Sequence, residues 1–338
     1  MEGANVSLMR KINLIFRFSY TLPFFMASLC GSLFAWLFYE PPLHIVVLMP
    51  LVVLMLAIFV NFSNDYFDHR SGVDKMRFHD KEERWRSMNE NDSVLLDKIY
   101  WGGNPFDDGL VNVAQGKIIM LLILAVAGLV AMPIFLYGGW PVIVFGGVGV
   151  LISYFYTAPP LNLGARGLGE VAVGASFFML VFFSFYVATG TFDWDTLAFT
   201  GVVWDILVWE IFAFAVIVGT LVGLMRLTDS MSGQEAHIAN GEKSIAVRFG
   251  LDGAGKIGKA FIIFAYLLYG VMFIFNPVYL VLFLTLPLTL KAWKIMTEMK
   301  DDWTIKLPPF FFGTAFVAEI LFIAAVCVQY AFDIGSIF

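Results

Sequence analysis

The sequence predicts an all-α protein that crosses a membrane many times, and its composition and periodicity carry this prediction. Hydrophobic residues make up 59% of the 338 positions and charged residues only 14%, whereas soluble domains contain about 45–50% apolar and about 25% charged residues. The apolar residues come in blocks of about 20, the length that a helix needs to cross the hydrocarbon layer. These observations exclude a soluble enzyme and a disordered chain. The net charge of −6 also leaves no basic field for nucleic acid.

Nine apolar blocks are long enough to be transmembrane helices. The third and fourth are separated by the turn at 138–141, and the seventh and eighth meet at Asn276-Pro277; both are helix-breaking sequences. The predicted spans are 17–39, 43–62, 116–137, 140–157, 168–189, 203–225, 257–275, 276–296 and 309–331.

The charged residues place all long connections on one face of the membrane. With nine spans, the 21 Lys and Arg residues all fall before the first span or in the four connections 63–117, 158–167, 226–259 and 291–306. The opposite connections and the C-terminal end carry Glu40, Asp193, Asp195 and Asp333 instead. The positive-inside rule therefore predicts a cytoplasmic N-terminus and an outer C-terminus. We expect a multi-pass protein of the cell (plasma) membrane.

Two connections on the basic face are long. They follow the second and sixth spans at 63–115 and 226–256, and connections of this length are usually functional or disordered. The polar stretch 78–98 within the first is compatible with a short amphipathic surface helix. We expect one membrane domain over residues 1–338, with these two loops beside the site.

The first cluster of chemically capable residues ends the second span. Asn61, Asp65 and Asp68 stand at i, i+4 and i+7, which is one helix face, and Asn64 joins them. Two carboxylates and two amides are a hard-oxygen set of the kind that binds Mg²⁺ together with substrate phosphates. The alternative is a solvated helix end, although acids there oppose the helix dipole.

A second acidic region follows the sixth span. Arg226 and Asp229 lie at its end, with Glu235 and His237 beyond them. Acids on the same face after two different spans could surround one anionic group through bridging cations. The second region alone could equally be an exposed loop.

A third stretch runs from Tyr154 and Tyr156 through Pro159-Pro160 to Arg166 and the glycines that follow it. The prolines end the fourth span, and the glycines allow a tight turn into the fifth. The alternative for the tyrosines is that they are ordinary interface aromatics. Two further acids, Glu210 and Glu319, lie inside predicted spans and are candidates on that ground alone; Glu210 could equally be the structural partner of a Trp or Tyr.

These motifs resemble the UbiA superfamily of intramembrane prenyltransferases over nearly the whole chain. They are similar to the branch that prenylates 1,4-dihydroxy-2-naphthoate in menaquinone synthesis. The motifs that carry the resemblance are Asn61-x-x-Asn64-Asp65-Tyr66-Phe67-Asp68-x-x-x-Gly72-x-Asp74, Asn104-Pro105-Phe106 with Gln115-Gly116, Tyr156-Thr157-Ala158-Pro159-Pro160, Arg166-Gly167-Leu168-Gly169-Glu170 and Ala246-Val247-Arg248-Phe249-Gly250.

The resemblance implies nine helices around a central cavity open to the cytoplasmic face, capped by the two long loops. It implies transfer of a polyprenyl group from an isoprenyl diphosphate to a naphthoquinone-precursor ring, with Mg²⁺ holding the diphosphate. Allylic cations are stabilised by aromatic faces and protected where water is excluded. The implied metal ligands are Asn61, Asp65, Asp68, Asp229 and Glu235. The implied catalytic residues are Asp65, Asp68, Asp229 and Tyr156, and the implied substrate-binding residues are Asn61, Asn64, Arg70, Tyr154, Arg166, Arg226, Lys243 and Arg248.

The chain departs from the family pattern at the second acidic motif. The family usually has Asp-x-x-x-Asp shortly before Ala-Val-Arg-x-Gly, and a gap-free count places Gly233 and His237 there. We expect a four-residue insertion that makes Asp229 the first acid, with Glu235 assisting; the alternative is an altered second metal site. The segment 75–103 is longer than the resemblance explains.

Two other functions remain open at this stage. The same family could use a glycerophosphate lipid or another aromatic acceptor. In a different class, the protein could be a secondary transporter of an anionic substrate, but the acids cluster at one face rather than near the midplane, where transporter sites lie.

Overall fold

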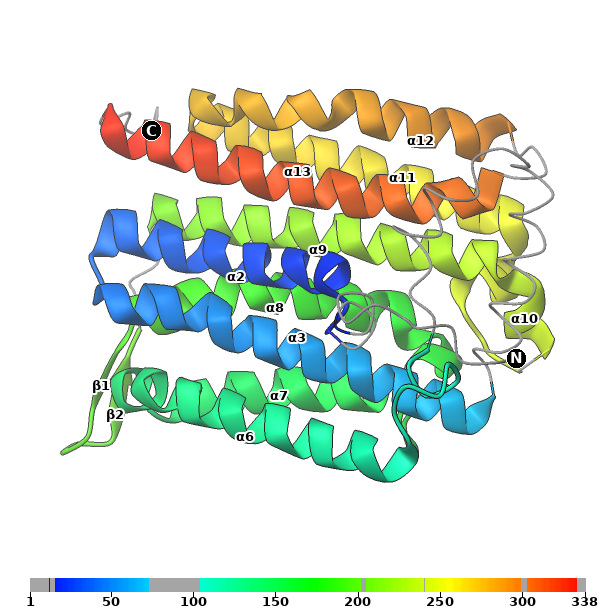
Figure 1. Ribbon diagram of the computed structural model, residues 1–338. Helices are drawn as coiled ribbons and strands as arrows, with labels where there is room; N and C mark the ends of the chain where they lie inside the picture. The colour runs from blue at the N-terminus through cyan, green and yellow to red at the C-terminus, as the bar shows by residue number, and fades with distance from the viewer. Residues whose placement is uncertain are drawn as a thin grey trace.

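The computed structural model describes residues 12, 16–72, 104–201, 205–239, 241–298 and 303–332, and these are mostly helical (Figure 1). Within these ranges, nine helices are long and apolar enough to cross a membrane, which confirms the predicted number. The segment 75–103, with its polar stretch 78–98, lies outside the described residues.

The long helices follow one another along the chain, with shorter helical segments and one hairpin between some of them. In order, the elements are α2 (Phe18–Tyr39), α3 (Leu43–Ser71), α6 (Val113–Gly138), α7 (Trp140–Thr157), the π-helical η1 (Gly164–Leu168), α8 (Gly169–Thr189), β1 (Thr191–Asp193), β2 (Ala198–Thr200), α9 (Ile206–Ser232), α10 (Gln234–Ala239), α11 (Ile245–Phe275), the 3₁₀ segment η2 (Pro277–Thr285), α12 (Leu286–Glu298) and α13 (Trp303–Ala331). The hairpin pairs Phe192 with Phe199 in antiparallel register.

Polar caps fix the beginnings of several helices. Asn112 and Gln115 form a reciprocal capping box at α6, and Asp205 accepts a hydrogen bond from the Val208 N–H at 3.0 Å at α9. Ser244 caps α11 in the same way. Each cap satisfies a backbone donor that the helix itself leaves free.

Two helices continue further than the hydropathy of the sequence predicts. α3 ends at Ser71 rather than near residue 62, and α9 ends at Ser232 rather than near residue 225. The additional turns carry the polar residues of the predicted site. The acids of the first and second clusters therefore stand on helices rather than on loops.

The centre of the bundle is α9, which packs against α8, α11 and α13 (Figure 1). It approaches α8 closely at Gly174 and Gly219, where a methyl group on either residue would lie under 3 Å from the other's carbonyl oxygen. Such close backbone contact is typical of membrane helices, which associate through packing of small residues. On the other side of α9, the rings of Phe214 and Phe322 are stacked 3.8 Å apart.

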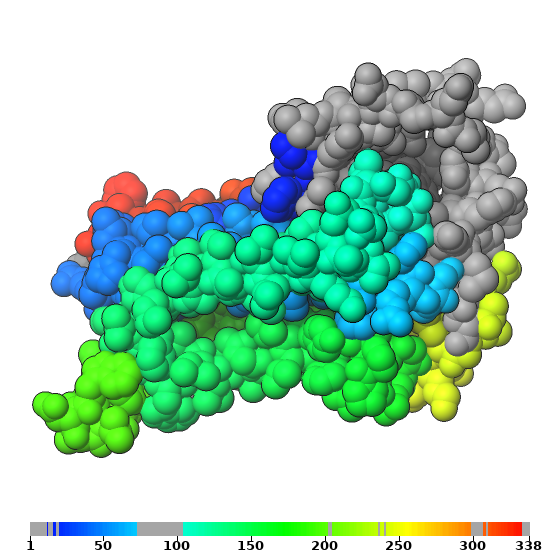
Figure 2. Space-filling model, turned by 60° about the horizontal axis from the view of Figure 1, so that its bottom comes forward, coloured from blue at the N-terminus to red at the C-terminus, as the bar shows by residue number. Residues whose placement is uncertain are grey.

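The periphery is apolar and exposed, as expected of a surface that faces lipid. Leu121 and Leu129 on α6 are 68% and 71% exposed, and Ile143 on α7 is 61% exposed. Figure 2 shows the face that α6 and α7 form. Side chains of this kind would be unfavourable in water but are compatible with hydrocarbon.

The two ends of the bundle differ in charge. At one end, which we call the basic end, lie the C-terminal turns of α3, α7 and α9 and the N-terminal turns of α6, α8 and α11, with Arg70, Lys117, Arg166, Lys243 and Arg248 (Figure 1). At the opposite end lie the α2–α3 connection, the β-hairpin and the start of α9, with Glu40, Asp193, Asp195 and Asp205.

A buried polar contact joins three helices near the opposite end. Tyr279 in η2 donates a hydrogen bond to Glu210 Oε2 on α9 at 2.7 Å, and Gln329 of α13 donates to the same oxygen at 3.4 Å. The expectation that Glu210 is the structural partner of a Tyr or Trp is confirmed. These partners engage one of the two oxygens of a carboxyl group that is costly to bury.

Candidate active site

The last turns of α3 carry the first predicted cluster and bury its acids. Asp65 and Asp68 are 1% and 8% exposed. Asn64 Nδ2 donates to Asp68 Oδ2 at 3.2 Å. The Oδ1 atom of Asn64 is buried and accepts no hydrogen bond from the described residues. This face of α3 therefore presents two carboxylates and a free amide oxygen together.

Arg17, just before α2, forms an ion pair with Asp65. Its Nη2 atom lies 2.6 Å from Asp65 Oδ1, and the Arg17 side chain is 16% exposed. Asn104 holds the backbone of the same residue, since its Nδ2 donates to the Asp65 carbonyl oxygen at 2.8 Å. Asp65 is thus fixed from two separate parts of the chain. Sequence analysis missed this role of Arg17, because its only signal was its position beside the first span.

The side chains on α3 fit a hard divalent cation that takes its remaining ligands from water or from a substrate. Mg²⁺ is usually bound by one or two carboxylates together with substrate phosphates, and Asn64 Oδ1 is a buried oxygen without a partner among the described residues. Within the described ranges there is no group of three or more His, Cys, Asp or Glu residues placed to hold a metal. These residues therefore fit a partial Mg²⁺ site that a phosphate-bearing substrate completes, and not an all-protein cage.

The end of α9 carries a second Asp–Arg pair. Arg226 Nη1 donates to Asp229 Oδ2 at 2.7 Å, with the Arg226 side chain 9% exposed and that of Asp229 35% exposed. A buried guanidinium needs a counter-charge, and Asp229 supplies one within a single helical turn. Asp229 is also the more accessible of the two groups.

The two tyrosines of α7 connect the acid-bearing helices. The Arg226 guanidinium carbon lies 5.8 Å from the centre of the Tyr156 ring, within the range of a cation–π interaction. Two residues earlier, the Tyr154 ring meets Phe67 of α3 edge to face, with 5.4 Å between centroids. α7 therefore packs against α3, and its Tyr156 ring contacts the Arg226 side chain of α9 at the basic end.

Glu170, in the first turn of α8, joins three elements of the basic end. Its Oε1 atom accepts hydrogen bonds from Ser230 Oγ on α9 at 3.3 Å and from the Ile245 N–H at the start of α11 at 3.2 Å. The residue is 7% exposed. Sequence analysis quoted Glu170 within a motif but assigned it no role.

The structure places His237 in a hydrogen-bonded pair. Its Nδ1 atom lies 2.5 Å from Glu242 Oε2, and the residue is 1% exposed. The other ring nitrogen lies against Gly233, where an added methyl group would be 3.3 Å away. Gly233 and His237, the positions of the gap-free count, therefore pack against each other.

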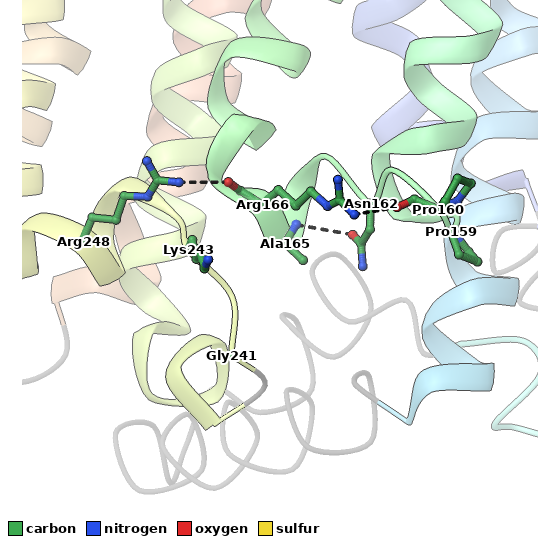
Figure 3. Close-up of a pocket in the computed structure, with 8 residues that line it drawn as sticks. All are labelled: Pro159, Pro160, Asn162, Ala165, Arg166, Gly241, Lys243 and Arg248. Carbon is green, nitrogen blue, oxygen red and sulfur yellow. Dashed lines mark hydrogen bonds between the residues drawn. The ribbon is translucent and has the colours of Figure 1, made fainter.

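A pocket of about 550 Å³ opens at the basic end between the α7–α8 connection and the segment before α11 (Figure 3). Three of the predicted substrate-binding cations line it. The lining residues are Pro159, Pro160, Asn162, Ala165, Arg166, Gly241, Lys243 and Arg248.

Apart from Tyr154, which packs against Phe67, the predicted site residues fall into three groups and two outliers at the basic end. The first group is on α3, the second joins Tyr156 to the Arg226–Asp229 pair, and the third surrounds the pocket. Arg70 is exposed, with its guanidinium 6.0 Å from the Tyr66 ring. Glu235 is exposed on α10.

Comparisons with known proteins show which family the chain is similar to. Residues 102–315 match the UbiA prenyltransferase family. The chain is 24% identical over 294 residues to 1,4-dihydroxy-2-naphthoate octaprenyltransferase of Bacillus subtilis (strain 168), covering 84% of this chain and 81% of that protein. It is 25% identical over 192 residues to 2-carboxy-1,4-naphthoquinone phytyltransferase of Synechocystis sp., covering 56% of this chain and 50% of that protein.

The fold is also that of a solved structure. A UbiA homolog from Archaeoglobus fulgidus, bound to DMAPP and Mg²⁺, superposes with a TM-score of 0.61 at 16% identity, covering 95% of this chain and 99% of that chain. The nine spanning helices, the acids at the ends of α3 and α9 and the match to more than half of the chain lead to one conclusion: the protein belongs to the UbiA prenyltransferase family and is a prenyltransferase.

Proposed function

We propose that the protein transfers a polyprenyl group from an isoprenyl diphosphate to an aromatic acceptor of the naphthoquinone-precursor type, with Mg²⁺. The observation that carries the proposal is the placement of Asp65 and Asp229 at the basic ends of two different helices, each beside an arginine. Both curated relatives act on naphthalene-type acceptors, as their names state. The acceptor class follows from that similarity.

In this proposal Asp65 and Asp68 hold Mg²⁺ with Asn61, and Asp229 contributes from α9 with Glu235 assisting from α10. Asn64 supplies its free amide oxygen to the same group of ligands. The bound cation neutralises the negative charge that develops on the departing diphosphate. Asp229, which is 35% exposed, can turn toward the diphosphate without a change in the fold.

The side chains of the protein supply the rest of the electrostatic environment. Arg226 is the buried cation next to Asp229, and it is positioned to share the charge of a diphosphate held there. Arg70 adds positive charge from the exposed end of α3. The ring face of Tyr156 already accommodates one cation, Arg226, and such a face also stabilises a developing allylic cation. Tyr154 positions α7 against α3.

The lipid-facing surface explains how a hydrophobic donor reaches the site. Its polyprenyl tail partitions into the bilayer, while the diphosphate lies at the basic end with the cations. We also propose that the basic end faces the cytoplasm, that the central cavity opens on that side, and that the membrane is the plasma membrane, since cytoplasmic connections are enriched in Lys and Arg. The transporter alternative is not favoured, because the family is one of prenyltransferases.

Product identification tests the proposal. Purified protein in lipid nanodiscs is incubated with Mg²⁺, geranylgeranyl diphosphate and, separately, 1,4-dihydroxy-2-naphthoate, 4-hydroxybenzoate and a glycerophosphate acceptor. Mass spectrometry should find a prenylated naphthalene product, and none with Asp65→Asn. Product with only the glycerophosphate or benzoate acceptor would replace the proposed acceptor class, and no prenylated product at all would contradict the function.

A further inference from the structure

The pocket at the basic end is built so that its cations hold fixed positions. Arg248 Nη2 donates to the Arg166 carbonyl oxygen at 3.0 Å, and Arg166 Nη2 donates to the Pro160 carbonyl oxygen at 2.9 Å. The Lys243 N–H donates to the Ala165 carbonyl oxygen at 2.8 Å. Figure 3 shows the guanidinium groups of Arg166 and Arg248 in these contacts. Two of these bonds, from Arg248 and from the Lys243 N–H, join the two segments, and the two side-chain bonds orient the guanidinium groups of Arg166 and Arg248.

Gly167 is required for this arrangement. Its backbone has φ of 82°, and an added methyl group would lie 2.2 Å from the Lys243 carbonyl oxygen and 2.7 Å from Arg248 Nη2. A backbone oxygen cannot move aside cheaply, so any side chain at this position would displace Lys243 and Arg248. Glycine also adopts this left-handed conformation without strain. The α7–α8 connection can therefore approach the segment before α11 only because residue 167 has no side chain.

The described residues that line the pocket carry positive charge and no negative charge that would compensate it. Arg166, Lys243 and Arg248 are three cations, and among the described residues that line the pocket there is no carboxylate. The partly buried Arg17 and the buried Arg226 differ in this respect, because each is paired with an aspartate. The three side chains are exposed at the mouth of the pocket, and their like charges attract an anion that enters it. A site without a carboxylate also lacks the ligands that Mg²⁺ prefers.

The connection itself separates this pocket from the buried groups of the proposed active site. Ala165 and Arg166 line the pocket, whereas the neighbouring Gly164 and Gly169 lie against Tyr156, and Gly169 also against Arg226 Nε. η1 and the first turn of α8 therefore form a wall with the pocket on one side and Tyr156 on the other. None of the proposed metal ligands lines the pocket.

We propose that the Arg166–Lys243–Arg248 pocket binds a phosphoryl anion without a metal ion. Fixed guanidinium groups bind phosphate oxygens well through paired hydrogen bonds, and three cations suit a multiply charged group. Among the lining residues that the structure describes, none has an aromatic ring to stack on a nucleotide base. Free diphosphate and the headgroup of an anionic lipid share the required chemistry. Diphosphate as the source rests on the proposed function, since that reaction releases it beside this wall.

Binding of inorganic diphosphate in the presence of EDTA tests the proposal. The full-length protein in phosphatidylcholine nanodiscs is titrated by isothermal calorimetry. We expect binding that EDTA does not abolish and that weakens about tenfold or more in Arg248→Gln, which corresponds to about 1.4 kcal/mol or more. Gly167→Ala should weaken it similarly although it removes no charge.

Matched control variants show whether weaker diphosphate binding comes from the pocket itself or from any loss of positive charge or any backbone strain in the protein. Lys259→Gln removes a cation that is packed near Trp293 and does not line the pocket. Gly109→Ala introduces the same kind of backbone strain, since Gly109 has φ of 69° but no atom within 4 Å of an added methyl group. Both controls, and Asp65→Asn, should bind diphosphate as the wild type does. Should Gly167→Ala fail to fold, Arg166→Gln takes its place.

A second arm distinguishes the two sources of the anion. Copurified lipid is extracted and compared between wild type and Arg248→Gln; selective loss of an anionic phospholipid, without binding of free diphosphate, would support the site with a lipid headgroup. Binding that requires Mg²⁺ or disappears in Asp65→Asn would overturn the proposal, and so would the absence of both ligands. EDTA-insensitive binding in a protein that forms no prenylated product would retain this site and refute the proposed function.

Discussion

Arg17 holds Asp65 through an ion pair of 2.6 Å between the start of α2 and the last turns of α3. Asp229 has a corresponding partner in Arg226 at 2.7 Å. In both cases a cation of the protein compensates an acid that we propose to hold Mg²⁺. When substrate binds, Mg²⁺ can take the place of the arginine beside each aspartate. The diphosphate can take the place of the aspartate beside each arginine, so that no charge is left uncompensated.

If Mg²⁺ takes the place of Arg17 beside Asp65, removal of Arg17 should change how strongly Mg²⁺ stabilises the protein. Arg17→Gln leaves a buried carboxylate with less compensation, which should destabilise the metal-free protein by about 1–3 kcal/mol. Added Mg²⁺ should then raise the thermal unfolding midpoint more in Arg17→Gln than in the wild type. Lys259→Gln serves as the charge control. Equal Mg²⁺-induced shifts in all three proteins would show that Arg17 and the metal do not share Asp65.

The second acidic motif predicts an order of effects. Asp229→Ala should lower turnover by about 100-fold or more, which is on the order of 3 kcal/mol of lost transition-state stabilisation. His237→Ala should cost less than about tenfold per folded protein, that is less than about 1.4 kcal/mol, because its ring is engaged with Glu242. The measurement is initial rate at saturating Mg²⁺, corrected for the folded fraction. The reverse order would mean that the gap-free alignment is right.

Two substitutions of Glu170 should differ in effect: Glu170→Ala removes the hydrogen-bond acceptor, whereas Glu170→Gln removes only the negative charge. Glu170→Ala removes the partner of Ser230 and of the Ile245 N–H, so the segment 241–248 should exchange its amide hydrogens faster. KM for the donor should rise about tenfold, equivalent to about 1.4 kcal/mol, with a smaller change in kcat. Glu170→Gln keeps an oxygen at the same place and should restore both values. If the Gln variant behaves as the Ala variant does, the charge of Glu170 rather than its hydrogen bonds is what matters.

The orientation of the bundle predicts opposite accessibility of its two ends. Asp193→Cys lies on the exposed hairpin, and Lys256→Cys replaces a side chain that is 75% exposed near the basic end. Both are made in a Cys327→Ser background, because Cys327 is exposed whereas Cys30 is buried. A membrane-impermeant maleimide should label Asp193→Cys in intact cells, and Lys256→Cys only after permeabilisation. Labelling of both in intact cells would refute the proposed topology.

Hydropathy was sufficient to predict the nine spans, but it located the ends of the helices poorly. It responds to apolar content, so the predicted second span stops near residue 62, although the spacing of Asn61, Asp65 and Asp68 indicates that the helix continues to the acids. The helix continues because its polar side chains have partners: Asn64 donates to Asp68, and Arg17 pairs with Asp65. The first of these contacts follows from helical spacing, and the second does not.

Contacts between distant segments account for what the sequence could not predict. The spacing of Asn61, Asp65 and Asp68 predicted their common face, and the Arg226–Asp229 pair is one helical turn. The joining of α8, α9 and α11 at Glu170 depends on how three helices pack, which no local pattern encodes. The same is true of Gly167. Only the position of the Lys243 carbonyl oxygen shows that a side chain at residue 167 would clash.

The Mg²⁺ dependence of diphosphate release in Asp65→Asn tests the central claim most directly. The substitution keeps the volume of the side chain and removes one carboxylate from the proposed site. With donor and acceptor present, release should fall by about 100-fold or more, on the order of 3 kcal/mol, and Mg²⁺ should no longer restore it, while circular dichroism shows an intact helical fold. Release that keeps its wild-type rate and its wild-type Mg²⁺ dependence in Asp65→Asn would contradict the account.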